Sequence, residues 1–167
     1  MIDLINNLLI DKSFYYIKRD YVVKKIEFKN RTFYAKFEKI DKPLEIQNIN
    51  DHLRKKITIA SPLIKDGFTN NLVFIYKGDD GEKFYHTIKQ LFLALKIEKY
   101  YIFEGKSEKH LQVFIPVNKL DLAQASIKLQ EISTALALKL PIEWQALPNN
   151  NLPDDYNIFT LPYKIFE

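Results

Sequence analysis

Residues 71–117 have the sequence NLVFIYKGDDGEKFYHTIKQLFLALKIEKYYIFEGKSEKHLQVFIPV, and the pattern of apolar residues within them indicates the order of strands and helices. An apolar run at 71–77 is followed by the polar turn GDDG and then, over 82–96, by apolar residues at helical spacing. Two more apolar runs, at 99–103 and 111–117, flank a charged stretch. This order predicts a strand, a helix and two further strands.

A second helix is expected after the last of these strands. Asp121 can cap its first turn with Gln124 as the partner in a capping box, and Pro141 ends it. Residues 71–140 then follow the strand, helix, strand, strand, helix order of RRM-like and ferredoxin-like sheets. We therefore predict an α+β fold, in which helices cover one face of an antiparallel or mixed sheet and leave its other face open.

The flanking segments are expected to join this core in a single domain, residues 1–167. Its parts are an N-terminal portion at 1–64, the core at 71–140 and a C-terminal segment at 141–167. The pattern of the N-terminal portion predicts a helix at 2–10, a hairpin formed by 21–29 and 31–40, a short helix at 48–56 capped by Asn48 or Asn50, a strand at 57–64 and a loop at 65–71.

Composition excludes several kinds of chemistry. The 167 residues include no cysteine, so disulfides, thiolate nucleophiles and cysteine-ligated zinc are excluded, and the three histidines form no HExxH pair. The N-terminus lacks the basic region of a signal peptide, and no run approaches the roughly 20 apolar residues of a membrane span. These features predict a soluble cytoplasmic protein that does not contact a membrane. Its net charge of +4 permits an anionic partner.

The candidate site is the charged stretch between the strands at 99–103 and 111–117. Lys106, Ser107, Lys109 and His110 lie within five positions there, and all can donate hydrogen bonds to phosphate oxygens. Glu104 and Glu108 interleave with the lysines, so a solvated hairpin end is the alternative interpretation.

Alternation along the second of these strands extends the candidate site. Leu111, Val113 and Ile115 share one face, which we expect to lie under the helices. His110, Gln112 and Phe114 share the other face, so His110 and Gln112 are expected together on the open side of the sheet, beside the charged stretch.

Residues 71–141 resemble the archaeo-eukaryotic primase superfamily, which includes the bacterial ligase-associated polymerase domains. That family is similar in having a strand, a helix, a strand, a turn such as TSGGKGLHV, a strand ending in proline and a long helix. Its turn holds the triphosphate of the incoming nucleotide through a serine, a lysine and a histidine. The resemblance places Lys109 on the lysine and Gln112 on the histidine, with Ser107 and His110 slightly displaced, and it implies that Tyr76 lines the open face.

The same resemblance implies a degenerate member, because the family's DxD metal motif is missing. Phe74, Ile75, Tyr76 and Lys77 occupy that strand, and two-metal nucleotidyl transfer requires carboxylates there. Asp79 and Asp80 are the only acids nearby, and they follow the strand as acids of the loop and helix start. No catalytic residue, no required cofactor and no Mg²⁺ are therefore expected.

Three functions follow as hypotheses. The first is a non-catalytic protein that binds nucleotides or nucleic acids, with a nucleoside triphosphate, (d)NTP, or a single strand as its partner. The second is a protein-interaction or structural module without a small ligand, and the third is an active nucleotidyltransferase that uses Asp79 and Asp80 in a rearranged turn. Six aromatic residues of the N-terminal portion could stack on bases or form core: Tyr15, Tyr16, Tyr21, Phe28, Phe33 and Tyr34.

Overall fold

The computed structural model describes residues 5, 8 and 10–166, so most of the helix predicted at 2–10 lies outside the described residues. In chain order the elements are β1 (Tyr15–Lys18), β2 (Lys24–Phe28), β3 (Arg31–Ala35), β4 (Phe37–Ile40), α2 (Ile46–Leu53), β5 (Ile59–Pro62), β6 (Phe68–Tyr76), α3 (Gly81–Ala94), β7 (Tyr101–Glu104), β8 (Leu111–Asp121), α4 (Leu122–Ala137), β9 (Trp144–Leu147), η1 (Asp154–Tyr156), β10 (Ile158–Thr160) and β11 (Lys164–Ile165). Within this described part of the chain, the helices are too short or too polar to cross a bilayer.

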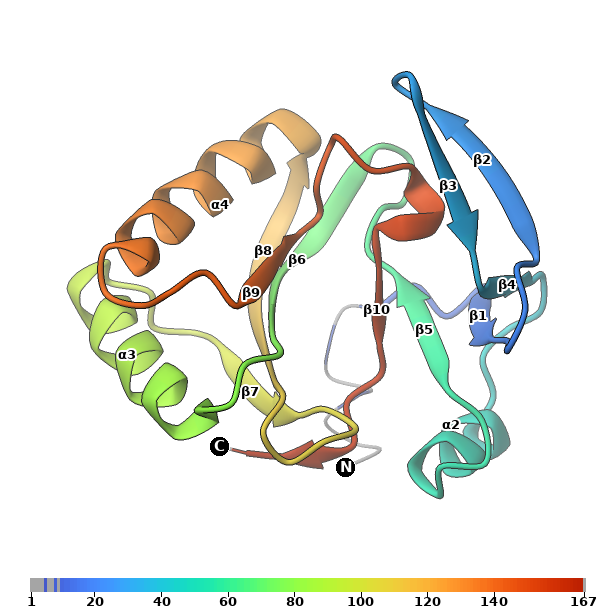
Figure 1. The fold of residues 1–167 in the computed structure, drawn as a ribbon, viewed down its shortest axis with the longest axis horizontal. Helices are drawn as coiled ribbons and strands as arrows, with labels where there is room; N and C mark the ends of the chain where they lie inside the picture. Colours follow the sequence, from blue (N-terminus) through green and yellow to red (C-terminus); the bar gives the residue numbers. More distant parts are fainter. Residues whose placement is uncertain (1–4, 6–7, 9, 167) are drawn as a thin grey trace.

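The central sheet has the strand order β11-β7-β8-β6-β9, and its pairings are antiparallel. Helices α3 and α4 lie together on one face of it (Figure 1). The prediction of an α+β fold with helices on one face is confirmed. The sequence did not indicate β9, which completes the ferredoxin-like order β6-α3-β7-β8-α4-β9.

Both helices of this unit start at an aspartate, as their sequences predicted. Asp80 accepts a hydrogen bond from the Lys83 backbone N–H (3.0 Å) at the start of α3. At the start of α4, Asp121 accepts from the Gln124 backbone N–H (2.8 Å), and the Gln124 side chain accepts from the Asp121 N–H (3.1 Å). The expected capping box is therefore present.

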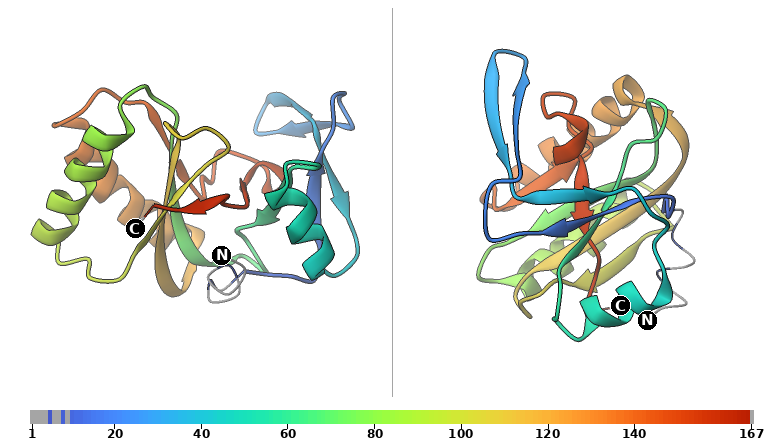
Figure 2. Two further views of the ribbon diagram at one scale, coloured as in Figure 1. Left: turned by 90° about the horizontal axis from the view of Figure 1, so that it is seen from below. Right: turned by 90° about the vertical axis from the view of Figure 1, so that its right-hand side faces the viewer.

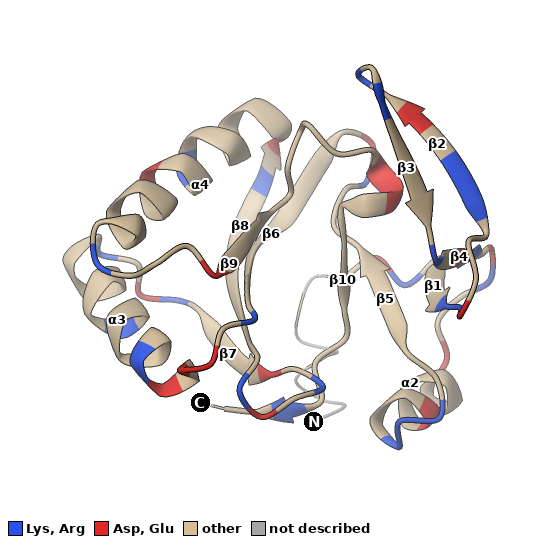
Figure 3. Ribbon diagram, viewed as in Figure 1, with Lys and Arg blue, Asp and Glu red and all other residues tan. Residues whose placement is uncertain are grey.

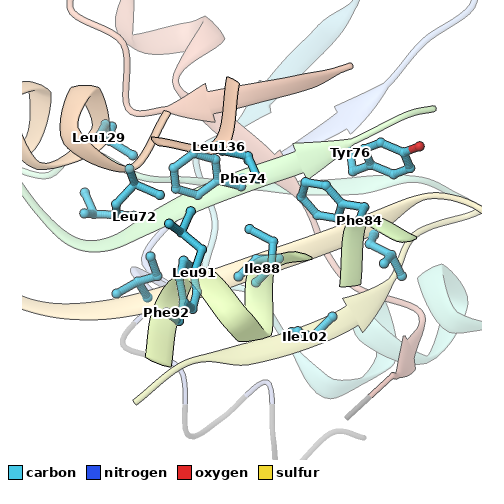
Figure 4. Packing of buried hydrophobic residues seen from close by; sticks show 14 of the residues in the cluster. Leu72, Phe74, Tyr76, Phe84, Ile88, Leu91, Phe92, Ile102, Leu129 and Leu136 are labelled. Atoms are coloured by element: carbon cyan, nitrogen blue, oxygen red, sulfur yellow. The ribbon is translucent and has the colours of Figure 1, made fainter. Parts of the chain in front are cut away.

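The core beneath the helices follows the predicted apolar stripes. Phe84, Ile88 and Leu91 of α3 are buried against residues of β6 such as Leu72 and Phe74 (Figure 4). Leu111, Val113 and Ile115 of β8 belong to the same core, as the alternation along that strand predicted.

Some predicted boundaries in the N-terminal half were wrong. Helix α2 begins after Glu45, earlier than expected, and Asn48 lies inside its first turn, where its side chain accepts from the Glu45 N–H (3.0 Å). Strand β6 already starts at Phe68, within the predicted loop. The predicted hairpin forms as β2–β3, but its second arm breaks before Phe37 because β4 pairs with β1 instead.

The expectation of an open sheet face was also wrong. A second sheet, in the order β10-β5-β1-β4, packs on the face that the helices leave free (Figure 2). The rings of Phe103, Phe114 and Phe159 meet there edge to face, with centroids 5.5 and 5.1 Å apart. All three side chains are buried, so this part of the central sheet has core on both sides.

A buried histidine joins α2 to distant parts of the chain. The Nδ1 atom of His52 accepts from the Ile59 N–H (3.0 Å), and its Nε2 atom lies 2.8 Å from the Leu161 carbonyl oxygen. A ring that accepts at Nδ1 and donates at Nε2 is neutral. Burial, with a smaller contribution from the charge of Lys106, lowers the pKa of His52 to about 4, although the hydrogen bond to the Leu161 carbonyl opposes the shift.

Replacing Phe114 with alanine should test the packing between the two sheets. We expect Phe114→Ala to lower the free energy of unfolding by about 3–5 kcal/mol, because it empties a fully buried aromatic site. Urea denaturation at neutral pH measures the change. Leu138→Ala is the control, because Leu138 is 86% exposed and its loss should cost less than about 0.5 kcal/mol. A loss below about 1 kcal/mol for Phe114→Ala would contradict this packing.

His52 should make the protein less stable in acid. Its folded-state pKa of about 4 lies below the ordinary value of 6.5, so as pH falls the unfolded chain takes up the proton first. The neutral His52 ring therefore adds about 3 kcal/mol to the free energy of unfolding. This contribution is complete above pH 6.5 and is lost as the pH falls from about 6.5 to about 4. Urea denaturation of wild type and His52→Gln at pH 7.5 and pH 4 should show their difference in unfolding free energy shrinking by about that amount. A difference independent of pH would refute the assignment.

Candidate phosphate-binding site

The charged stretch between β7 and β8 forms one exposed loop. Lys106, Ser107 and Lys109 are exposed and His110 is half-buried. The loop is closed by two backbone hydrogen bonds, from the Gly105 N–H to the His110 carbonyl (2.9 Å) and from the His110 N–H to the Ser107 carbonyl (3.0 Å). The four predicted phosphate-binding residues are thus near one another, but they lie on a protruding turn.

Gln112 does not belong to an open surface beside this turn. Its side chain is 4% exposed, and its Nε2 atom donates to the Thr160 carbonyl oxygen (2.7 Å). Phe114, on the same strand face, lies under Phe159. The predicted pocket of His110 and Gln112 is therefore absent, because the C-terminal segment forms β10 over that part of the sheet.

The prediction that Tyr76 lines the open face of the sheet was also wrong, because Tyr76 lies on the face that the helices cover. It pairs with Leu111, whereas its neighbour Ile75 pairs with Gln112, so Tyr76 and Gln112 face opposite ways. The Tyr76 ring stacks on Phe84 in the helix-side core, with centroids 4.4 Å apart. Its hydroxyl accepts from the Asp80 N–H (3.0 Å) and donates to Glu143 (3.1 Å).

The two candidate metal acids occupy a loop and a helix start. Asp80 is the N-cap of α3, and Asp79 is exposed in the turn before it. Among the residues that the structure describes, no group of three or more His, Asp or Glu side chains is arranged to hold a metal ion. A paired-carboxylate geometry on the strand, which two-metal chemistry needs, is not built by Asp79 and Asp80.

A different site appears where the second sheet ends, near β9. A cleft there is lined by three lysines, Lys18, Lys36 and Lys77, and by side chains able to stack or hydrogen bond, among them Tyr34, Gln145 and Thr160. We call it the lysine cleft. The central sheet contributes Ile75, Lys77 and Gln145 to it, and β10 contributes Ile158 and Thr160.

Each lysine of the cleft is held by its backbone at the end of a strand. Lys18 ends β1, where its N–H donates to the Thr58 carbonyl (3.0 Å). Lys36 links β3 to β4, and its carbonyl accepts from the Arg19 N–H (2.7 Å). Lys77 follows β6 and donates its N–H to the Glu143 carbonyl (3.1 Å). The three side chains therefore start from fixed positions around one hollow.

The lysine cleft has excess positive charge. Its acidic residue, Asp155, already accepts from the Tyr16 hydroxyl (2.7 Å) and from Lys24 Nζ (3.3 Å). Burial raises the pKa of Tyr16, so this hydroxyl stays a donor. Among the described residues, Lys18, Lys36 and Lys77 form no salt bridge.

The segment that contains Lys18 and Lys36 is rich in positive charge. Residues 18–36 contain seven Lys or Arg and two Asp or Glu, a net charge of +5, whereas the whole chain carries +4. Five of these nine residues, from Lys24 to Arg31, lie on the hairpin β2–β3, where Figure 3 shows the basic segments in blue. This clustering was visible in the sequence and was missed, because the basic and acidic residues were judged over the whole chain.

The N-terminal aromatic residues divide between core and surface. Tyr15, Tyr16 and Phe33 are buried, so the core interpretation holds for them, and Phe28 is half-buried. Tyr34 is 58% exposed and lines the cleft, and Tyr21 is 61% exposed. Of the six, Tyr34 is the one whose ring is free to stack on a ligand in the cleft.

Comparison with known proteins bears on the N-terminal part of the chain. A family model described as a domain of unknown function, DUF1882, matches residues 2–71. No curated protein matches the chain. The matched segment contains Lys18, Tyr34 and Lys36, and it ends within β6, before Lys77.

Proposed function

We propose that this protein binds the phosphate groups of a nucleotide or nucleic acid in the lysine cleft, without catalysing a reaction. The observation that carries the proposal is the convergence of Lys18, Lys36 and Lys77, from three separate strand ends, on one hollow. Each ammonium group supplies three hydrogen-bond donors and one positive charge. Such an arrangement favours an anion that carries several oxygen acceptors.

The other cleft residues suit the remaining parts of a nucleotide. The exposed ring of Tyr34 provides a stacking surface for a base, which is a contact tolerant of base identity. The Gln145 amide and the Thr160 hydroxyl offer both donors and acceptors to a sugar or a base edge. Asp155 is engaged by Tyr16 and Lys24, so its charge opposes an incoming phosphate less than that of a free carboxylate.

The resemblance to the primase superfamily stays a hypothesis, and the order of β6, α3, β7, β8 and α4 is compatible with it. In this hypothesis the turn at 106–110 no longer binds the triphosphate of a nucleotide, which is what the corresponding turn does in the family. The burial of Gln112 supports that change of site. The placement of Asp79 and Asp80 supports a binding role over nucleotidyl transfer.

An interaction module is the second candidate, and a separate observation favours it. Four large apolar side chains on the helical side of the molecule are highly exposed: Leu93 (82%), Ile127 (73%), Leu138 (86%) and Ile142 (73%). All four lie on or just after α3 and α4, and a contiguous apolar patch there would mark a protein contact. This function requires no ligand in the lysine cleft, so the experiment below separates the two candidates.

Removing the three lysine charges should weaken binding. We expect Lys18→Gln/Lys36→Gln/Lys77→Gln to weaken binding of a fluorescent nucleoside triphosphate or a labelled 12-nucleotide oligo(dT) at least tenfold, measured by fluorescence anisotropy. For the oligonucleotide, the slope of log K against log salt should fall by about 2, since three phosphate contacts at about 0.7 each are lost.

A double variant in the turn between β7 and β8 serves as the control. Lys106→Gln/Lys109→Gln removes two charges from the predicted turn and should leave both affinities within about twofold of wild type. A loss of binding in this variant, with the cleft variant unaffected, would move the site to the turn between β7 and β8. Absence of binding by the wild type at low salt would leave the interaction module as the better candidate. Circular dichroism melting should confirm that both variants remain folded.

A further inference from the structure

The hairpin β2–β3 projects from the body of the protein (Figures 1 and 2), and Tyr34 at its base lines the lysine cleft. Contacts with the loop around η1 hold the hairpin in place. Lys29 Nζ donates to the Asn150 carbonyl (2.8 Å), Lys24 pairs with Asp155 (3.3 Å), and the Phe33 ring packs on Tyr156 with centroids 4.9 Å apart. The hairpin is therefore a supported arm whose base forms part of the cleft.

One face of this arm continues the chemistry of the cleft. Lys25 is paired with Tyr34 in the strand register, so their side chains are neighbours on one face. Lys36 follows Tyr34 by two residues, which is about 7 Å along a strand. An exposed aromatic ring thus lies between one lysine of the arm and one lysine of the cleft.

This face of the arm carries a positive charge that a small ligand in the cleft would not reach. Lys25 forms a salt bridge to Glu27 (3.5 Å), but the two side chains are 61% and 66% exposed, so the pair is weak. Arg31 lies on the opposite face of the hairpin, with Phe33, because it pairs with Phe28 in the register. Lys25 does not line the cleft, so a single nucleotide bound there would leave its charge without a phosphate.

We infer that the ligand of the lysine cleft is a single-stranded nucleic acid that runs from the cleft onto the arm. This inference rests on the proposed function and names its ligand class. A single strand offers both features that the surface matches, namely successive phosphates for the cleft lysines and Lys25, and unpaired bases for Tyr34. A duplex keeps its bases stacked inside, so it presents no base face to that ring.

A length series tests the inference on the full chain. Fluorescence anisotropy would compare a labelled thymidine triphosphate, oligo(dT) of 4, 8 and 12 nucleotides, and a 12-base-pair duplex. We expect the affinity of the 12-mer to exceed that of the triphosphate at least tenfold, and that of the duplex by a similar factor. Equal affinity for the triphosphate and the 12-mer would overturn the single-strand inference while leaving the proposed function intact, and an equally tight duplex would overturn it as well.

An arm variant identifies the path of the strand. Lys25→Gln should weaken binding of the 12-mer severalfold and lower its salt slope by about 0.7, while the triphosphate affinity stays within twofold. Lys128→Gln, on α4, removes the same charge far from the arm and should change the affinity of neither ligand. A 12-mer unaffected by the arm variant would overturn the inference. If no ligand binds the wild type, the proposed function itself fails.

Discussion

The central sheet is buried on both of its faces, and the positions of the surrounding elements follow from this. Phe114 illustrates it, since its ring meets Phe103 in the same sheet and Phe159 in the covering sheet. The central strand β6 follows the same rule, with Leu72, Val73 and Phe74 all fully buried although neighbours point to opposite faces. A strand covered on both sides is a continuous apolar run, and β6 has that character.

The C-terminal segment joins the two sheets, because β10 belongs to the second sheet and β11 to the central sheet. Three polar contacts reach it from distant positions, namely His52 to Leu161, Tyr16 to Asp155, and Gln112 to Thr160. Each pairs a buried polar group with a partner, because an unpaired one would cost free energy in the core. These contacts join the N-terminal sheet, the central sheet and the last strands into one arrangement.

The lysine cleft lies at the edge of the second sheet, where that sheet no longer covers the central sheet. The second sheet protects the β7–β8 side of the central sheet, and toward β9 it leaves a hollow between Lys77 and the base of the hairpin. Strand ends lie at such an edge, and long cationic side chains can remain in water there while their backbones stay in the sheets. The positive charge of residues 18–36 is therefore presented on one side of a hollow instead of being spread over the surface.

Local sequence patterns were enough to predict the helices α3 and α4, their aspartate caps and the row of β8 residues that faces the helices, because caps and apolar periodicity are local features. The local excess of Lys and Arg could also have located the basic hairpin. Contacts between distant segments determine what covers the second face of the central sheet, and therefore also the burial of Gln112 and the position of the cleft. Alternation along a strand shows that one of its faces is apolar, but it does not show which segment packs on that face. The segment that packs on Phe114 contains Phe159, 45 residues further along the chain. Likewise, Lys18 and Lys77 meet only because β1 and β6 end beside the same hollow.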